Sequence, residues 1–295
     1  MKFVSECTAR MTAGMLCALL AASCAEGDRQ EPANQMQAPE PRTLPSSGEA
    51  RSTPAQATMR NVTIDTLAYG EVGDQLVYGH FAFPEDMVDP LPAVILIHDW
   101  WGLNDEIKSY GTRLAAEGFI VLAIDLFNGS TATAPAGARD LELAVVEDPD
   151  FALANIRQAY RFVKDVAGAP SVAVLGFGFG GGWALTTAIA QPADFAAIVT
   201  YYGQVNSDQD SLAPVTGQIL GLFAENDRAV PADNVRAFER ALEALDKEFE
   251  VVVYDGARRG FADALMVDAY DANVAARAWE RTLEFLRASL AVGSM

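Results

Sequence analysis

The chain has 295 residues, of which 51% are hydrophobic, and a formal net charge of −19 at pH 7. This length and apolar content allow a large core, and α/β folds of this size often form a single domain. The acidic balance argues against nucleic-acid binding, which needs a basic surface, and we interpret it as favouring solubility. All three cysteines lie within the first 24 residues. We therefore predict no cysteine-based zinc site, no internal disulfide and no cofactor in the folded body.

The first 24 residues are typical of a bacterial lipoprotein signal peptide. Lys2 and Arg10 flank the start of an apolar run, Met11–Ala22, that is too short to span a bilayer, and small residues then precede Cys24. We predict that residues 1–24 direct export and that Cys24 carries the lipid, which would anchor the protein to a bacterial membrane, facing the periplasm or the cell exterior. An ordinary secretory signal cleaved nearby is the alternative, and it also predicts export.

Residues 25–60 are rich in Pro, Gln, Ala, Ser and Glu and show no sustained apolar period. A segment of this composition cannot bury a core. Its prolines favour extended geometry. We therefore predict a disordered linker that holds a folded domain, residues 61–295, away from the membrane.

From residue 61 the chain alternates between strand and helix patterns. Residues 61–69 and 75–83 alternate apolar and polar side chains around a glycine-containing turn, which predicts an antiparallel hairpin at a sheet edge. Short apolar runs predict strands buried on both faces, at 93–97, 119–124, 172–175, 196–200, 218–223 and 248–253. Amphipathic segments predict helices at 106–117, 151–166, 182–190, 232–245 and 273–290. This order predicts an α/β fold with a mostly parallel central sheet and helices on both faces.

Residues 172–185 form the most informative motif. An apolar run leads into Gly176, Gly178 and Gly180 and then into a helix-compatible segment. A strand, a sharp turn and a helix with this small-x-nucleophile-x-small spacing form the nucleophile elbow of α/β-hydrolases, where the reactive side chain stands at the apex. The apex here is Gly178, which has no side chain that could attack a substrate.

Together with this elbow, three further stretches carry a family resemblance: residues 96–127, 223–231 and 254–261. They resemble the dienelactone hydrolase family of the α/β-hydrolase superfamily. The resemblance covers roughly residues 60–290, with the motifs in the chain order that the fold requires, and it implies the α/β-hydrolase fold and a family activity on carboxylic esters or lactones.

The resemblance also implies which residues stand at the triad positions. The nucleophile position is Gly178, the acid position is Asp227 and the base position is Arg259. A nucleophile needs an adjacent base, and arginine stays protonated at any useful pH. The resemblance therefore implies a member with a degenerate triad, in which the family's covalent mechanism should not operate.

The anion-binding half of such a site depends on backbone geometry and can survive these losses. The resemblance places the oxyanion donors at the backbone N–H groups of Trp100 and Phe179, at the start of a helix. Arg259 adds a fixed cation. Two readings stay open for it: an ion pair with Asp227 that stabilises the loops, or a pocket for a carboxylate or another small anion.

Four more residues are predicted at the pocket. Trp101 and Tyr202, with Trp100, are expected to form apolar walls. His98 could be a structural residue or a relocated base, and Asp99 could orient a water or pair with a neighbouring cation.

Three functions follow as hypotheses. The first is a non-hydrolysing family member that binds a small carboxylate or lactone. The second is an active hydrolase that uses Asp99 or His98 in an arrangement foreign to the family. The third is a structural or interaction module that uses only the fold.

Overall fold

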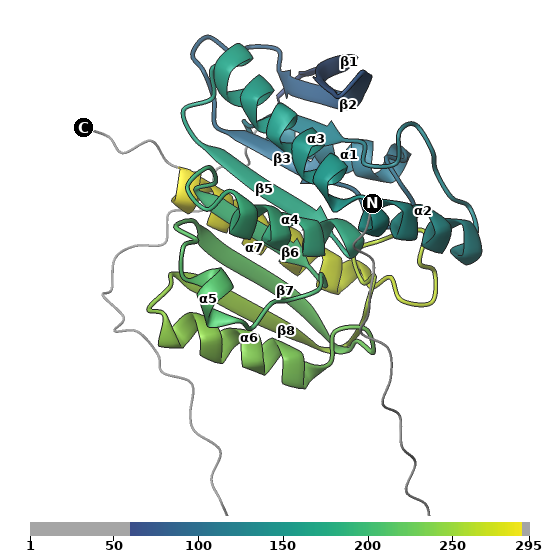
Figure 1. The fold of residues 1–295 in the computed structure, drawn as a ribbon, viewed down its shortest axis with the longest axis vertical. Coiled ribbons are helices and arrows are strands. Elements are labelled where there is room, and N and C mark those ends of the chain that lie inside the picture. Colours follow the sequence, from purple (N-terminus) through teal and green to yellow (C-terminus); the bar gives the residue numbers. More distant parts are fainter. Residues whose placement is uncertain (1–59, 291–295) are drawn as a thin grey trace, which may run out of the picture. The chain divides into compact units, whose positions relative to one another are not determined.

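The computed structural model describes residues 60–290, which form an eight-stranded sheet with helices on both faces (Figure 1). The predicted signal segment, Cys24, nearly all of the predicted linker and the last five residues lie outside this range. The strands are β1 (Val62–Val72), β2 (Gln75–Pro84), β3 (Ala93–Ile97), β4 (Ile120–Ile124), β5 (Val172–Phe177), β6 (Ala197–Tyr201), β7 (Gln218–Asn226) and β8 (Phe249–Arg258).

Seven α-helices connect or follow these strands in the described range. They are α1 (Asp105–Ala116), α2 (Pro135–Glu147), α3 (Pro149–Arg161), α4 (Phe179–Ala190), α5 (Gln209–Leu212), α6 (Ala232–Ala244) and α7 (Ala272–Leu290). A π-helical turn, Phe162–Val166, continues α3. Among these residues no helix is both long and apolar enough to cross a membrane.

The strand order is β1-β2-β4-β3-β5-β6-β7-β8. Strand β2 pairs antiparallel with β1 and β4, whereas all the other pairs are parallel. The predicted edge hairpin and mostly parallel sheet are therefore confirmed. Because parallel strands end at the same edge, the loops after β3, β5, β6, β7 and β8 meet there.

Alternate residues of the central strands pack into two separate cores. Ile95 and Val174 face α3, α4 and α6, whereas Leu96 and Leu175 face α1 and α7. The strands are buried on both faces, which explains why they appear in the sequence as continuous apolar runs.

Helix α2 is an element that the sequence patterns did not predict. Only Ala138 and Val145 of its residues are buried, so its apolar period is weak. Its start nevertheless has a local signal, because Pro135 occupies a first-turn position where the missing N–H costs nothing. Helix α2 forms one wall of a cavity of about 1090 Å³.

Candidate functional site

The turn between β5 and α4 places a helix N-terminus at the carboxyl edge of the sheet. Gly178 has φ 50° and ψ −106°, a backbone conformation that strongly favours glycine and that occurs at strained functional turns. A Cβ on Gly180 would lie 2.8 Å from the carbonyl carbon of Ile97. Only glycine therefore lets α4 approach the end of β3 this closely, and this approach brings Phe179 N–H next to the β3 loop.

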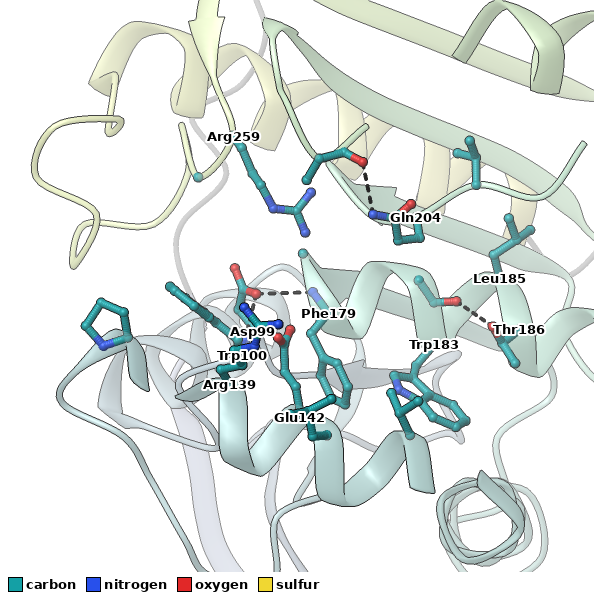
Figure 2. A pocket seen from close by; sticks show the side chains of 18 of the residues that line it. Asp99, Trp100, Arg139, Glu142, Phe179, Trp183, Leu185, Thr186, Gln204 and Arg259 are labelled. Carbon is teal, nitrogen blue, oxygen red and sulfur yellow. Dashed lines mark hydrogen bonds between the residues drawn. The ribbon is translucent and has the colours of Figure 1, made fainter. Parts of the chain in front are cut away.

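The carboxylate of Asp99 is hydrogen-bonded to the two backbone N–H groups that are expected to form the oxyanion site. Its Oδ1 accepts hydrogen bonds from Trp100 N (2.7 Å) and Phe179 N (3.2 Å) (Figure 2). A Cβ added to Gly178 would also lie 2.7 Å from Asp99 Cγ, well inside van der Waals contact. The Asp99 side chain thus fills the space beside Gly178 and accepts hydrogen bonds from both of the N–H groups that the resemblance assigns to an oxyanion site.

Burial raises the pKa of the Asp99 carboxyl, and the charge of Arg259 and the two backbone N–H groups counteract part of this rise. Burial favours the neutral acid, whereas an adjacent cation and N–H donors favour the carboxylate. The cation and the N–H donors that would attract an external anion therefore already act on the Asp99 carboxyl group.

Asp227 and Arg259 form an ion pair beside this carboxylate. Asp227 Oδ2 lies 3.2 Å from Arg259 Nη1, and its Oδ1 accepts hydrogen bonds from Ala229 N (2.7 Å) and Val230 N (3.0 Å). The same Nη1 donates to the carbonyl of Tyr202. The Asp227 side chain has 0% exposure and that of Arg259 has 30%, so the carboxylate is sequestered while the guanidinium reaches the cavity.

His98 is buried, is not among the residues that line the cavity, and has both ring nitrogens hydrogen-bonded. Its Nε2 accepts from Leu126 N (3.1 Å), so Nδ1 carries the proton and donates to the Asp99 carbonyl (2.7 Å). Burial lowers the pKa of the imidazole. Both ring nitrogens of this neutral, buried histidine are engaged, which fits the structural reading better than a relocated base.

Trp101 and Tyr202 line a second, much smaller cavity and not the large one, so two of the three predicted aromatic walls lie elsewhere. Trp101 Nε1 donates to Asp263 Oδ2 (3.0 Å). Burial and a hydrogen bond with Glu106 raise the pKa of Asp263 to about 7. The side chains of Trp101 and Tyr202 are both buried and belong to this smaller cavity.

A cavity of about 1090 Å³ opens beside Asp99 and Trp100. Its walls come from α2, α4, the loop after β6 and the loop after β8, which contributes Arg259, Gly260 and Met266. Its volume is slightly above the range of about 300–1,000 Å³ that is typical of small-molecule sites. The arrangement can enclose a mainly apolar ligand that carries a polar group at one end.

The charged groups of this cavity gather near the start of α4, where Figure 2 shows Asp99, Glu142, Arg139 and Arg259 around the Phe179 end of the helix. Burial, with a contribution from the charge of Asp99, raises the pKa of Glu142, and Arg259 and Arg139 oppose this rise. Two carboxyl groups and two guanidinium groups thus share this end of the cavity.

Several of these lining residues could not be identified from sequence motifs. Arg139 and Glu142 lie on the unpredicted helix α2, and Trp183 lies on α4 beyond the glycines. The one sequence signal for any of these three residues was the position of Trp183, a tryptophan about one turn after the elbow. No group of three or more His, Cys, Asp or Glu within residues 60–290 is placed to hold a metal ion.

Comparisons with known proteins agree on one family. The model of the dienelactone hydrolase family matches residues 77–290. An Aquifex aeolicus protein assigned by name as a carboxymethylenebutenolidase is 30% identical over 205 residues, covering 68% of this chain and 89% of its own length. A Bradyrhizobium protein assigned by name as a 2-oxo-3-(5-oxofuran-2-ylidene)propanoate lactonase is 30% identical over 208 residues, covering 67% of this chain and 84% of its own.

Among solved structures, a dienelactone hydrolase-like promiscuous phosphotriesterase from metagenomic libraries superposes with a TM-score of 0.71. It is 23% identical, and the match covers 77% of this chain and 98% of that chain. The dienelactone hydrolase of Anabaena variabilis gives a TM-score of 0.58 at 19% identity, covering 78% and 99%. At these identities the likeness supports the fold alone.

Proposed function

Since this chain belongs to the dienelactone hydrolase family, we propose that it no longer hydrolyses esters by the family's covalent route and that it binds a small carboxylate-bearing or lactone-like molecule. One observation carries the proposal most directly. The Asp99 carboxylate accepts hydrogen bonds from Trp100 N and Phe179 N, so the donors that would stabilise a tetrahedral oxyanion are already used.

Two further features support the loss of hydrolysis. Gly178 offers no nucleophile, and Arg259 stands where the resemblance places the base. Arginine cannot accept a proton in the working pH range, and it is held by Asp227. In a triad whose members act as a unit, the loss of one member removes most of the rate.

Two features of the cavity support ligand binding: the guanidinium group of Arg259 and the apolar walls. Arg259 lines it, and within residues 60–290 the hydrogen bonds of this side chain all come from Nη1. Its Nε and Nη2 groups can therefore donate to a carboxylate, in the geometry that guanidinium groups favour. The apolar remainder of the cavity would bury the body of the ligand.

Butanoate and benzoate are expected to bind the wild-type protein in isothermal titration calorimetry. The affinity should fall by at least about tenfold in Arg259→Gln, because a charge-assisted hydrogen bond contributes about 1.5–3 kcal/mol. It should rise as the pH is lowered, because Asp99 and Glu142, whose pKa values are raised, then take up protons at a higher pH than ordinary carboxyl groups do and repel the anion less.

The matched control is Arg258→Gln, which changes the neighbouring arginine outside the cavity lining and should leave the affinity unchanged. Equal affinities in Arg259→Gln and the wild type would contradict the proposed site. If neither carboxylate binds at any pH, the remaining reading is the interaction module that uses only the fold.

A second candidate function is an active hydrolase that uses Asp99. Its support is that Asp99 is a partly buried carboxyl lining the cavity, with a raised pKa, as a general base often has. Turnover of p-nitrophenyl acetate by the wild type, lost in Asp99→Asn, would favour this reading over the first. His98 is a weaker base candidate because both of its ring nitrogens are engaged.

We further propose export and lipid anchoring at Cys24, on the sequence pattern alone. Bacteria that produce the full chain should hold it in the membrane fraction, and metabolic labelling with a radioactive fatty acid should mark it. Cys24→Ser should lose the label and move to the soluble exported fraction, because it has no thiol to acylate. An unlabelled wild-type protein released from the membrane would instead support an ordinary secretory signal.

A further inference from the structure

The large cavity is a groove between one face of α2 and one face of α4. The α4 face consists of residues at helical spacing, namely Phe179, Gly182, Trp183, Leu185, Thr186 and Ile189. The α2 face repeats this pattern with Pro135, Ala136, Arg139, Glu142, Leu143 and Val146. Residues three and four apart line one side of a helix, so both helices present a continuous stripe to the same space.

The groove is long and its charge is confined to one end. A helix rises about 1.5 Å per residue, so the stripe from Phe179 to Ile189 extends for about 15 Å and the one from Pro135 to Val146 for about 16 Å. Figure 2 places the labelled charged residues at the Phe179 end of α4 and shows Trp183 and Leu185 farther along the helix.

Apolar side chains on the α2 wall remain exposed to solvent. Leu143 is 46% exposed and Val146 is 60% exposed, although both line the groove. Exposed apolar surface gathered in a groove is typical of a ligand site. A narrow apolar ligand between α2 and α4 would cover both side chains.

We propose that the ligand is a linear acyl carboxylate, such as a free fatty acid, with its chain between α2 and α4 and its headgroup at Arg259. This identification rests on the proposed carboxylate-binding function and adds the shape of the ligand's body. A compact lactone or a short carboxylate would fill only the charged end and would leave the Leu143–Val146 wall and Ile189 uncovered.

A homologous series of straight-chain carboxylates tests this assignment. Butanoate, hexanoate, octanoate, decanoate and dodecanoate, each below its micelle concentration, are titrated calorimetrically into the full chain. The affinity is expected to increase about fourfold per added methylene, which corresponds to about 0.8 kcal/mol for burying one CH₂, and to level off once the chain reaches the end of the groove.

Thr186→Trp is the diagnostic variant, because Thr186 is exposed on α4 within the groove and a tryptophan there obstructs the apolar end. It should bind butanoate as the wild type does and bind dodecanoate at least about tenfold more weakly than the wild type. Ala190→Trp introduces the same side chain at an exposed position of the same helix outside the groove, and should behave like the wild type throughout.

The outcomes separate this proposal from the one on which it rests. Binding that depends on Arg259 but not on chain length would overturn the acyl ligand and leave the carboxylate site standing. A chain-length dependence that is unchanged in Thr186→Trp would place the acyl chain elsewhere and also overturn it. If no carboxylate of any length binds, both proposals fail.

Discussion

The double substitution Gly178→Cys with Arg259→His is expected to give little ester hydrolysis, whereas adding Asp99→Ala should raise the rate by about 10²–10³-fold, the effect typical of an oxyanion-hole donor. The two exchanges supply a nucleophile and a base beside Asp227. They do not free Trp100 N and Phe179 N, to which the Asp99 carboxylate is hydrogen-bonded.

Asp99 also limits the space available at position 178. A side chain at position 178 would overlap the Asp99 carboxylate, so the new cysteine would have to displace a partly buried group that holds two hydrogen bonds. Removing the Asp99 carboxylate provides both the space and the two donors. Steady-state hydrolysis of p-nitrophenyl acetate by purified variants measures the effect, with circular dichroism to verify that each variant is folded.

The matched control for this experiment is the triple variant with Gly178→Ala in place of Gly178→Cys. It has the same opened anion site but no nucleophile, and should show no turnover above the uncatalysed rate. A double variant as active as the triple one would refute the conclusion that Asp99 blocks the site. If the variant that combines Gly178→Cys, Arg259→His and Asp99→Ala is folded but inactive, the site must differ from an active one at further positions.

Arg259→Ala is expected to lower the free energy of unfolding by about 3 kcal/mol, as measured by urea denaturation followed by tryptophan fluorescence. Breaking a buried ion pair costs about 3–5 kcal/mol because it leaves one charge uncompensated. The loss of unfolding free energy in Arg259→Ala should lie near the lower limit of this range, because the Arg259 side chain is partly exposed while the Asp227 side chain is not.

The double variant Arg259→Ala with Asp227→Asn should recover at least half of this loss. The asparagine is neutral, and its oxygen can still accept from Ala229 N and Val230 N, as the aspartate does. Arg258→Ala, at an exposed neighbour, should change stability by less than about 0.5 kcal/mol. A loss below about 1 kcal/mol in Arg259→Ala would mean that the pair behaves as a surface ion pair.

The sheet could be predicted well because its strands carry strong local signals. The apolar runs at 93–97 and 218–223 coincide with β3 and with most of β7, since a strand covered on both faces has few polar positions. Strand β8 runs five residues past the predicted end at Val253. Its polar continuation pairs with the end of β7, and no apolar pattern marks this pairing.

The candidate site could be predicted only in part. The position of Gly178 at a sharp turn followed from glycine spacing, and the Asp227–Arg259 pair was one of the two readings left open for Arg259. Helix α2 could not be recognised because it buries few of its side chains. The groove that it forms with α4 therefore had no counterpart in the predicted site.

By itself, the sequence determined the family motifs, the missing side chain at Gly178 and the permanent charge of Arg259, because each of these depends on residue identity alone. Only the tertiary structure decided which group lies beside Gly178. Asp99 is adjacent to Trp100 in the chain but lies 80 positions before Phe179, and its carboxylate bonds to both N–H groups. That contact exists because β3 and β5 are neighbours in the sheet and because Gly180 lets α4 begin against the end of β3.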